Sequence, residues 1–541
     1  MHSDQVELIA RQALEQIEHG RVEGVDRALA ELSVRANDPG ARAWSLAIRA
    51  HRSIVAPSSL DAAGLEPPAP VTDATSPTER RAGAWTCIAL ERAALLATDR
   101  DALERLLALH DRCAGADDSG ELALRASAGR LWSRVLDGDQ DIEESCRSVV
   151  QTAGRLRLAD VVVETTALRA LAALGRDEPQ PAVALARRAA RMARTEAMPE
   201  PERMACFVLA RVRRSTGQPH LALRILTALA RVVPPRWRPW LEWELLFAGA
   251  TRAPGAGTAT ALVEILDAAR GGDRARFDRA VSAQESALAW ADRARERDAL
   301  VAALDPQVDP STMEPPLRAW ALGETPVAAR GLLGAASPGE GETALAHVVT
   351  GPYGVPRRCL SDGVALVGDE SALRLARMQR RQGRLDTAAA VLALAGAPGL
   401  EATHFFREVY GFPFAPALHR GALDVLVHRL RERLHDGAVV HRTSERLVLE
   451  PRRVLVLPDP RCAPLVGDRI LRLLAVERRA SARDAAKRLG VPLRTVQTAL
   501  RELVADGACS VQRDRGRVEY GVQEPTFSDT TTRLGMTRLP E

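Results

Sequence analysis

The sequence predicts a mainly α protein in which a long helical N-terminal region precedes two small α+β domains. Three observations indicate this class. Apolar residues, mostly Ala, Leu and Val, recur at helical spacing over most of the N-terminal half. Two later stretches combine such helices with short segments typical of strands. The chain has 541 residues, 46% of them hydrophobic, which is enough for about three or four domains.

The first part of the chain is expected to be helical apart from one linker. Residues 1–55 predict two or three helices, broken at Gly20 and around residues 38–40. Residues 56–80 are rich in Pro, Ser and Ala without periodicity, so they predict a linker. Residues 81–250 predict a series of helices separated by short polar breaks.

Two parts of this helical series look alike. A helix, a break and a helix at residues 166–195 recur at residues 206–232, about forty residues later, with Ala where paired helices would touch. The pattern resembles tetratricopeptide-like helical repeats, although its period exceeds their usual length of about 34 residues and their aromatic signature is absent. That resemblance implies a curved scaffold that binds a protein partner. An irregular α-helical bundle is the alternative.

An aromatic cluster closes the series. Trp237, Trp240 and Trp243 recur every three residues and would form one face of a helix. We interpret this face as a contact between helices or as a cap of the helical region, in preference to a ligand site. Residues 251–350 continue with helical periodicity and then Pro- and Gly-rich connectors, and they suggest no chemistry.

Residues 355–458 predict the first α+β domain. A hairpin is expected from residues 355–360 and 364–367, followed by a helix at 371–382. Three more helices follow, of which the last begins near Arg420, and the domain ends in a hairpin at residues 438–450 that turns at Thr443 and Ser444. The apolar stripe of the last helix leaves polar residues for the surface, among them His419 and Arg433.

The order of leading strands, three helices and a terminal hairpin resembles the effector domain of OmpR/PhoB-type response regulators, a winged helix. Val409-Tyr410-Gly411 stands where that family has a V-W-G-like sequence before the recognition helix. The extra helix at 371–382 and the lack of a Gly-rich turn in the wing depart from the family pattern. Contact of this domain with protein, in a dimer or with polymerase, is the alternative to contact with DNA.

Residues 465–525 predict the second α+β domain. Ser481 can cap a helix that ends at Gly490, and Pro492 suits the entry of a second helix that buries Val496 and Leu500. An apolar stripe at 470–474 predicts a supporting helix before them, and strands at 509–512 and 518–522 predict a hairpin after them. This order resembles the winged helix-turn-helix families of bacterial transcription regulators. A three-helix packing unit without DNA contact is the alternative.

The resemblances imply duplex DNA as a partner. Residues 355–541 hold 31 basic and 22 acidic side chains, against 43 and 48 in the rest of the chain, so the C-terminal third is the basic part. The second domain offers polar side chains on its outer face and wing: Lys487, Arg494, Thr495, Gln497, Thr498, Arg501, Arg513, Arg515 and Arg517. The first domain offers Arg420, Asp424, His428, Arg431 and Arg442.

Several classes of protein are disfavoured. Lys487 is the single lysine and lies in the helix-turn-helix, so a phosphate-binding P-loop and lysine-based catalysis have no lysine to use. No zinc-ligand spacing joins the seven scattered cysteines, and no catalytic motif is present, so we expect no catalytic residues, metal or cofactor. Carboxylates fall on the expected helix surfaces, where we interpret them as solvated. With no secretory leader and no membrane span, we expect a cytoplasmic protein.

Together these patterns predict a bacterial DNA-binding transcription regulator. Its helical region would receive a signal or a protein partner, its two winged helices would engage DNA, and residues 526–541 would form a disordered tail. A homodimer fits this hypothesis. One alternative is a non-enzymatic adaptor whose winged helices contact proteins. Another is a DNA-binding component of a defence or mobile-element system.

Overall fold

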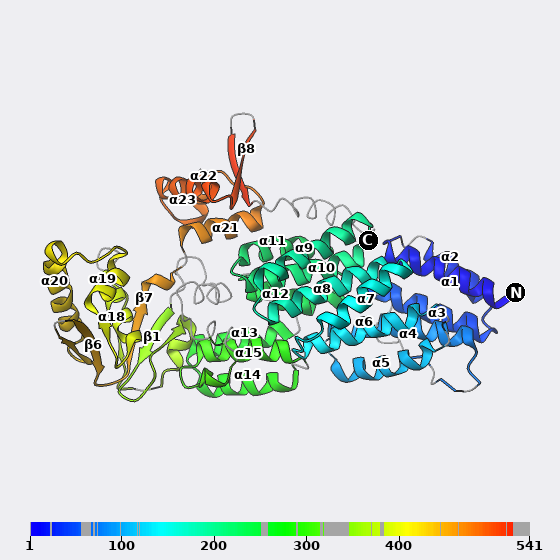
Figure 1. Ribbon diagram of the computed structural model, residues 1–541, viewed down its shortest axis with the longest axis horizontal. Helices are drawn as coiled ribbons and strands as arrows, with labels where there is room; N and C mark the ends of the chain where they lie inside the picture. Colours follow the sequence, from blue (N-terminus) through cyan, green and yellow to red (C-terminus); the bar gives the residue numbers. More distant parts are fainter. Residues whose placement is uncertain are drawn as a thin grey trace.

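The computed structural model describes residues 2–522 apart from 22–23, 56–66, 69–70, 73, 98, 116, 118, 250–257, 288–289, 314–317, 319–345, 369, 379–382, 444, 464 and 515–516. The described chain is mainly helical, and all of its strands fall between residues 346 and 522 (Figure 1). The predicted fold class is therefore confirmed. The expected tail at 526–541 lies outside the described residues, as does most of the expected linker.

Three helices open the chain: α1 (His2–Glu18), α2 (Val25–Ser33) and α3 (Pro39–Val55). Their breaks fall where the sequence predicts them. Gly20 takes a left-handed backbone with φ 70°, and the Asp38 carboxylate accepts a hydrogen bond from the Gly40 N–H at 2.9 Å as α3 begins. Trp44 and Ile48 of α3 are fully buried in the core that these helices share with α4.

The helical series starts earlier than predicted, at Pro77 inside the expected linker. A reciprocal cap explains this start, because the Ser76 N–H donates to the Glu79 carboxylate at 2.9 Å while the Glu79 N–H donates to the Ser76 hydroxyl at 3.3 Å. The series contains α4 (Pro77–Ala97), α5 (Arg100–Ala114), α6 (Glu121–Leu136), α7 (Glu143–Leu156), α8 (Ala159–Gly175), α9 (Pro179–Thr195), α10 (Pro199–Ser215), α11 (Pro219–Leu229), the 3-10 turn η2 (Pro235–Trp237) and α12 (Arg238–Phe247).

The middle of this series is regular. Four residues in the left-handed region follow α7 to α10 at intervals of twenty: Arg157, Asp177, Ala197 and Gly217. At each of these four ends, the next N–H donates to a carbonyl five residues back, at 2.8 to 2.9 Å. This hydrogen bond is the one that closes a helix in the Schellman arrangement. The forty-residue offset in the sequence therefore corresponds to two helix-and-turn units.

The aromatic cluster lies inside the protein. Trp237, Trp240 and Trp243 are almost completely buried, and the Trp237 ring stacks on Phe207 of α10 with centroids 5.2 Å apart. The prediction of a contact between helices is therefore confirmed. Three helices follow, α13 (Thr258–Gly271), α14 (Arg274–Ala287) and α15 (Ala291–Leu304), and then the 3-10 turn η3 (Pro310–Thr312).

The first α+β unit contains two sheets. In the larger sheet the order is β2 (Arg357–Leu360), β1 (Ala346–Thr350), β7 (Leu455–Asp459) and β3 (Leu373–Arg374). In the smaller sheet the order is β4 (Leu400–Glu401), β6 (Arg446–Pro451) and β5 (Ala438–Arg442). Three helices pack with them, α18 (Gly383–Ala395), α19 (Ala402–Tyr410) and α20 (Pro416–Leu434). The unit therefore includes residues 346–350, which precede the predicted boundary at 355.

Three sequence predictions for this unit are wrong. Residues 361–366 form the 3-10 turn η4 (Ser361–Leu366), so β2 pairs with β1 and makes no hairpin with residues 364–367. The predicted helix at 371–382 is absent from its described part, where β3 pairs in parallel with β7. The last helix begins at Pro416 and not near Arg420, because Pro416 occupies its first turn and the Ala415 N–H donates to His419 Nδ1 at 2.9 Å.

The C-terminal unit follows the 3-10 turn η5 (Pro460–Cys462). It contains α21 (Val466–Glu477), α22 (Ala482–Leu489), α23 (Leu493–Ala505) and the hairpin of β8 (Cys509–Asp514) and β9 (Arg517–Val522). Figure 1 shows this unit standing on the helical region. Leu221 of α11 lies in the same core as Ile470 and Leu471 of α21, and Arg224 donates to the carbonyl of Val522. In the described part of the chain, no helix is long and apolar enough to cross a bilayer.

Several carboxylates that the sequence placed on solvated surfaces are buried instead. Glu244, Asp305, Asp386 and Asp459 are each at most 2% exposed. Each has an arginine partner, as in the ion pair of Asp386 with Arg433 at 2.6 Å. Arg433 was expected on the surface and is half-buried by this contact. Helical spacing alone cannot predict such buried ion pairs, because it assigns every charged residue to the solvent-facing side of a helix whether or not a partner neutralises its charge.

Candidate nucleic-acid interface

Helix α21 supports the other two helices of the C-terminal unit. Its Ile470 and Leu474 are fully buried against Val496 and Leu500 of α23. The spacing of four within each helix puts these side chains on one face, so α23 buries its apolar side and leaves its other side outward. Val491 fills the turn between α22 and α23, where it is half-buried against the same core.

Helix α22 has defined ends. The Ser481 hydroxyl accepts a hydrogen bond from the Asp484 N–H at 3.2 Å and donates to the Asp484 carboxylate at 2.6 Å. The hydrogen bond that the hydroxyl donates to the carboxylate lowers the pKa of Asp484. Gly490 ends the helix at φ 61°, and its N–H donates to the carbonyl of Ala486. The predicted cap and the predicted terminator are both confirmed.

The cap allows a local test. Replacing Ser481 with Ala should destabilise α22 by about 1 kcal/mol, because the N–H of Asp484 loses its acceptor. Hydrogen exchange of residues 482–489 in the full chain should then become about fivefold faster. Ser481→Asp keeps an acceptor and should exchange like the wild type. Equal acceleration by both substitutions would contradict this role of the hydroxyl.

The outward face of α23 carries the polar residues that were predicted from the sequence to contact DNA. Arg494, Gln497, Thr498 and Arg501 are exposed, and Thr495 is half-buried. The Thr498 hydroxyl donates to the carbonyl of Arg494 at 3.0 Å. Among the residues that the structure describes, Arg501 makes only long contacts of 3.4 Å within the helix. The two guanidinium groups are therefore available to an external acceptor.

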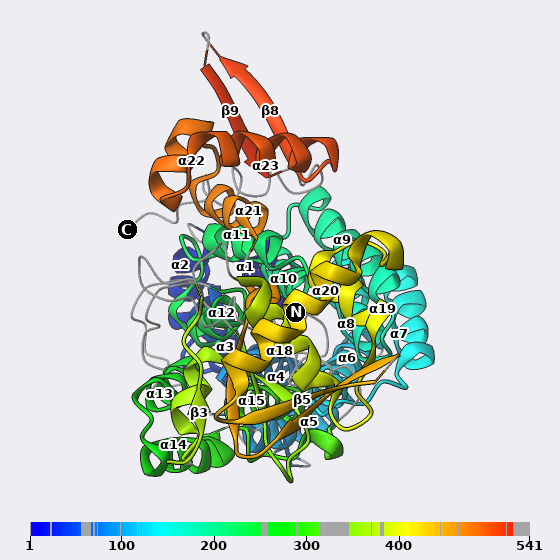
Figure 2. The same ribbon diagram turned by 90° about the vertical axis from the view of Figure 1, so that its left-hand side faces the viewer.

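The hairpin β8–β9 projects beyond α23 (Figure 2). Its register pairs Cys509 with Val522 and Asp514 with Arg517, so both strands are longer than predicted. A bridge between Ala480 and Tyr520 fixes its base to the loop before α22. Arg513 and Arg517 are exposed near the tip, whereas Arg515 lies outside the described residues.

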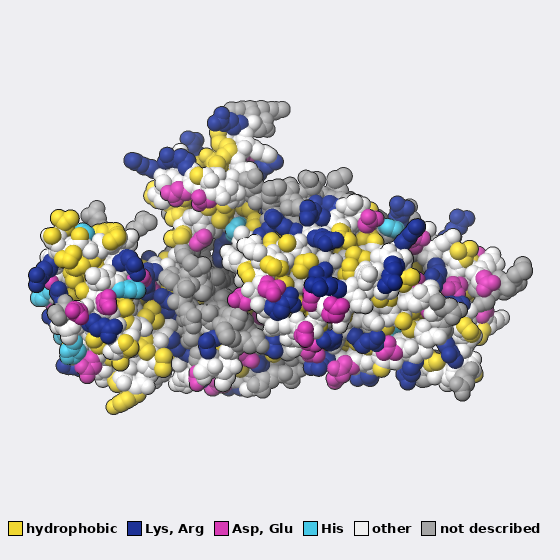
Figure 3. All heavy atoms as spheres, in the orientation of Figure 1, with side chains coloured by type: hydrophobic (Ala, Val, Ile, Leu, Met, Phe, Trp, Pro, Cys, Tyr) yellow, Lys and Arg dark blue, Asp and Glu magenta, His cyan; other side chains and the backbone are white. Residues whose placement is uncertain are grey.

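Basic side chains gather on the part of this unit that faces away from the helical region (Figure 3). Residues 465–522 contain 12 Lys and Arg against 7 Asp and Glu, a net charge of +5. Lys487 is exposed, as expected. A surface of this sign attracts the phosphate backbone of nucleic acids and releases its counterions.

A helix, a sharp turn and a second helix with an exposed polar face form the geometry that places a helix in the major groove. Residues 469–508 match the model of the winged helix-turn-helix DNA-binding family. The match extends from the first turn of α21 to the residue before β8. It does not include the hairpin β8–β9, so the wing is identified from the structure and not from the family match. Neither the curated proteins nor the solved structures contain a match to the chain.

Three exposed arginines of the winged helix-turn-helix are absent from the residues predicted from the sequence. Arg478 and Arg479 precede the cap, Arg483 lies in the first turn of α22, and all three are exposed. Backbone contacts often come from the first helix of such a unit. The signal in the sequence is the basic pair Arg478-Arg479 just before Ser481.

In the first α+β unit, most of the residues predicted to contact DNA interact with other residues of the same unit. Asp424 and Arg442 form an ion pair with each other at 2.5 Å, His428 lies 3.3 Å from Glu432, and the Arg431 guanidinium donates to the carbonyl of Val440 at 3.0 Å. Arg420 is exposed. Most of these side chains therefore have partners within the unit.

The exposed face of α20 is partly apolar. Leu418 is 80% exposed and Val425, two turns later, is 54% exposed. His419, expected on the surface, stacks on the Phe406 ring with centroids 5.0 Å apart, in a cluster with Phe412 and Phe414. This face is less suited to nucleic acid than that of α23.

Metal chemistry finds no support among the residues that the structure describes. They contain no group of three or more His, Cys, Asp or Glu that could hold an ion. All seven cysteines are buried as free thiols. Four histidines of the first α+β unit lie instead beside single carboxylates: His404, His428, His435 and His441.

Proposed function

We propose that the protein is a transcription regulator that binds duplex DNA through its winged helix-turn-helix, with α23 in the major groove. The observation that supports this most is the outward face of α23, which holds the exposed Arg494, Gln497 and Arg501 beside a basic wing. Such side chains hydrogen-bond to base edges and phosphates. The wing arginines would contact the backbone or the adjacent minor groove.

The first α+β unit is proposed as a second winged helix of the OmpR type. Its order of α18, α19, α20 and the hairpin β5–β6 supports this assignment. Since Asp424, Arg431 and Arg442 are engaged within the unit and Leu418 is exposed, we assign it the weaker DNA contact. Its apolar face would serve a protein contact, between two copies of the chain or with polymerase.

The helical region is proposed as the part that receives a protein partner. Its regular helix-and-turn units from α7 to α10 support a stacked, tetratricopeptide-like scaffold, because stacked units of equal length expose a continuous face. The docking of α21 on α11 links this scaffold to the DNA-binding unit. A partner on the scaffold would thus act close to the DNA.

Binding of the full chain to a random duplex of about 25 base pairs, followed by fluorescence anisotropy, tests the DNA contact. With four or five phosphates neutralised, the logarithm of affinity should fall against the logarithm of salt with a slope of about −4. A fourfold rise in salt should therefore weaken binding about 250-fold. Absence of binding at low salt would refute the regulator and favour the adaptor, which the exposed Leu418 and Val425 also suit.

Selection of duplexes from a random pool separates a regulator from a structural DNA-binding component. A regulator that reads bases through α23 should enrich a defined sequence, because each correct contact adds about 1–3 kcal/mol of discrimination. Enrichment of no sequence, together with salt-dependent binding, would support the defence or mobile-element alternative.

A further inference from the structure

A cavity of about 130 Å³ lies between helices of the N-terminal region and is partly open to solvent. Its lining comes from α1, α3, α4, α5, α6, α8 and α10, so it lies where the first helices meet the regular series. Cavities of about 150 Å³ hold a benzene-sized ligand. The space is therefore sufficient for an organic molecule of about six heavy atoms.

Part of the cavity lining is apolar. Ile54, Val55, Leu95, Leu103 and Trp132 line it, and all five are nearly or fully buried. An apolar wall of this extent favours a ligand with a short hydrocarbon chain.

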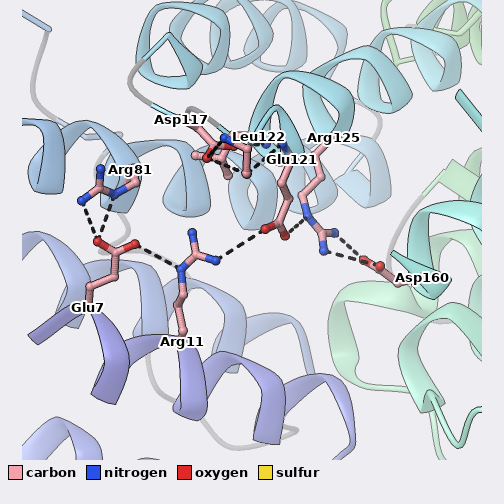
Figure 4. Close-up of polar contacts among 9 residues, drawn as sticks. Glu7, Arg11, Arg81, Asp117, Glu121, Leu122, Arg125 and Asp160 are labelled. Carbon is pink, nitrogen blue, oxygen red and sulfur yellow. Dashed lines mark hydrogen bonds and ion pairs between the residues drawn. The ribbon is translucent and has the colours of Figure 1, made fainter. Parts of the chain in front are cut away.

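The rest of the lining includes charged residues, and most of these charges neutralise one another. Arg125 forms ion pairs with Glu121, at 3.0 Å, and with Asp160. Figure 4 shows that these contacts continue through Arg11 to Glu7, so α1, α4, α6 and α8 are held together around the site. Arg92 pairs with Glu164 in the same way. The charges of both guanidinium groups are thus compensated, although the Nη1 atom of Arg92 is buried without a hydrogen-bond partner among the described residues.

Two carboxylates of the lining keep free acceptor capacity. Among the described residues, no hydrogen bond or ion pair engages the Glu18 side chain, which is half-buried at the end of α1. The Oε1 atom of Glu200 is buried without a partner, while its other oxygen accepts from Arg203. A buried carboxylate oxygen without a donor is costly, so Glu200 would gain from a ligand N–H, and the half-buried Glu18 can accept a second one.

We propose that this cavity binds a small organic ammonium ion with a short apolar chain. The ammonium would donate to Glu18 and Glu200, and the hydrocarbon would lie against Trp132 and the leucines. Burial, with the nearby charge of Asp160, raises the pKa of Glu18 to about 7, so an ammonium would take the place of the proton that this carboxyl otherwise binds. The site goes beyond DNA binding and does not depend on it.

Isoamylamine is the probe, because its six heavy atoms match the space. Isothermal titration of the full chain at pH 8, where both Glu18 and the ammonium are charged, should show millimolar or tighter binding. Isoamyl alcohol and isocaproate have a similar chain without the positive charge, and they should bind at least tenfold more weakly. Equal binding of amine and alcohol, or no binding of the amine, would overturn the proposal.

The variants Glu18→Gln and Glu200→Gln locate the site. Each should weaken isoamylamine binding at least tenfold, since the amide carries no charge. Glu15→Gln is the matched control, because Glu15 is exposed on the same helix one turn away, and it should bind the amine like the wild type. Glu18→Gln should fold normally, because burial already favours its neutral form. Unchanged binding in both cavity variants would place the amine elsewhere and refute the assignment.

Discussion

Replacing Arg494, Arg501 and Arg513 together with alanine should lower the affinity of the full chain for duplex DNA about a hundredfold. The three side chains are exposed on α23 and the wing. A direct arginine contact is worth about 1–3 kcal/mol, so three contacts give at least about 3 kcal/mol. The salt slope should also become shallower, by about 0.9 for each of these arginines that contacts a phosphate. Fluorescence anisotropy over a range of salt measures both quantities.

The matched control removes three exposed arginines from the helical region, Arg27, Arg105 and Arg155. It changes the net charge by the same amount and should leave the salt slope unchanged. Neither triple variant removes buried atoms, so thermal unfolding should change little. A similar loss of affinity in both would show that net charge, and not the face of α23, governs binding.

The sequence could predict those parts of the fold whose signals are local. The cap at Ser481, the helix end at Gly490 and the spacing of four between Val496 and Leu500 each depend on a few neighbouring residues. The structure confirms all three predictions. The Schellman ends of α7 to α10 are local too. The turns at these ends mark the forty-residue offset in the sequence, even though the amino-acid sequences of the helices between them differ.

The errors concern contacts between distant parts of the chain. Strand β1 pairs with β7, which lies more than a hundred residues later in the chain. Strand β3 pairs with the same strand although its own sequence favours a helix. Gly363 lies so close to the carbonyl of Leu304 in α15 that a Cβ would sit 1.7 Å from its oxygen. That contact favours the 3-10 turn at residues 361–366, where the Ser-Asp-Gly sequence by itself suggested the turn of a hairpin.

The candidate site was predictable for a related reason. Residues that touch DNA must face outward from a helix whose inward side is set by apolar spacing, so the face of α23 follows from its own sequence. The cavity near Glu18 could not be found in this way. Its lining comes from seven helices, and no single helix shows which of its charges meet.

Replacing Arg214 with Ala should destabilise the helical region by about 3–5 kcal/mol. Arg211 and Arg214 of α10 are nearly buried between Glu244 of α12 and Glu296 of α15. Arg214 reaches both carboxylates, at 2.5 and 2.6 Å. Its removal leaves two buried carboxylates to share one guanidinium, and breaking such a buried pair typically costs this much.

Urea unfolding followed by tryptophan fluorescence can report the change, because Trp243 donates to Glu296 at 2.6 Å. The exposed Arg188 of α9 is the matched control, and its replacement by Ala should stay within about 0.5 kcal/mol of the wild type. A loss for Arg214→Ala no larger than for Arg188→Ala would mean that the four charges do not stabilise the fold.

The same four charges predict how stability depends on pH. Burial alone would raise the pKa of Glu296, but the charges of Arg211 and Arg214 and a hydrogen bond from Trp243 lower it to about 2. A carboxyl whose folded pKa lies below its ordinary value of 4.5 stabilises the fold fully above that value, and this contribution is lost as the pH falls toward 2. Glu296→Gln should therefore lower stability at pH 7 and flatten its dependence between about pH 5 and 2. An equally steep acid transition in that variant would assign the effect to other carboxylates.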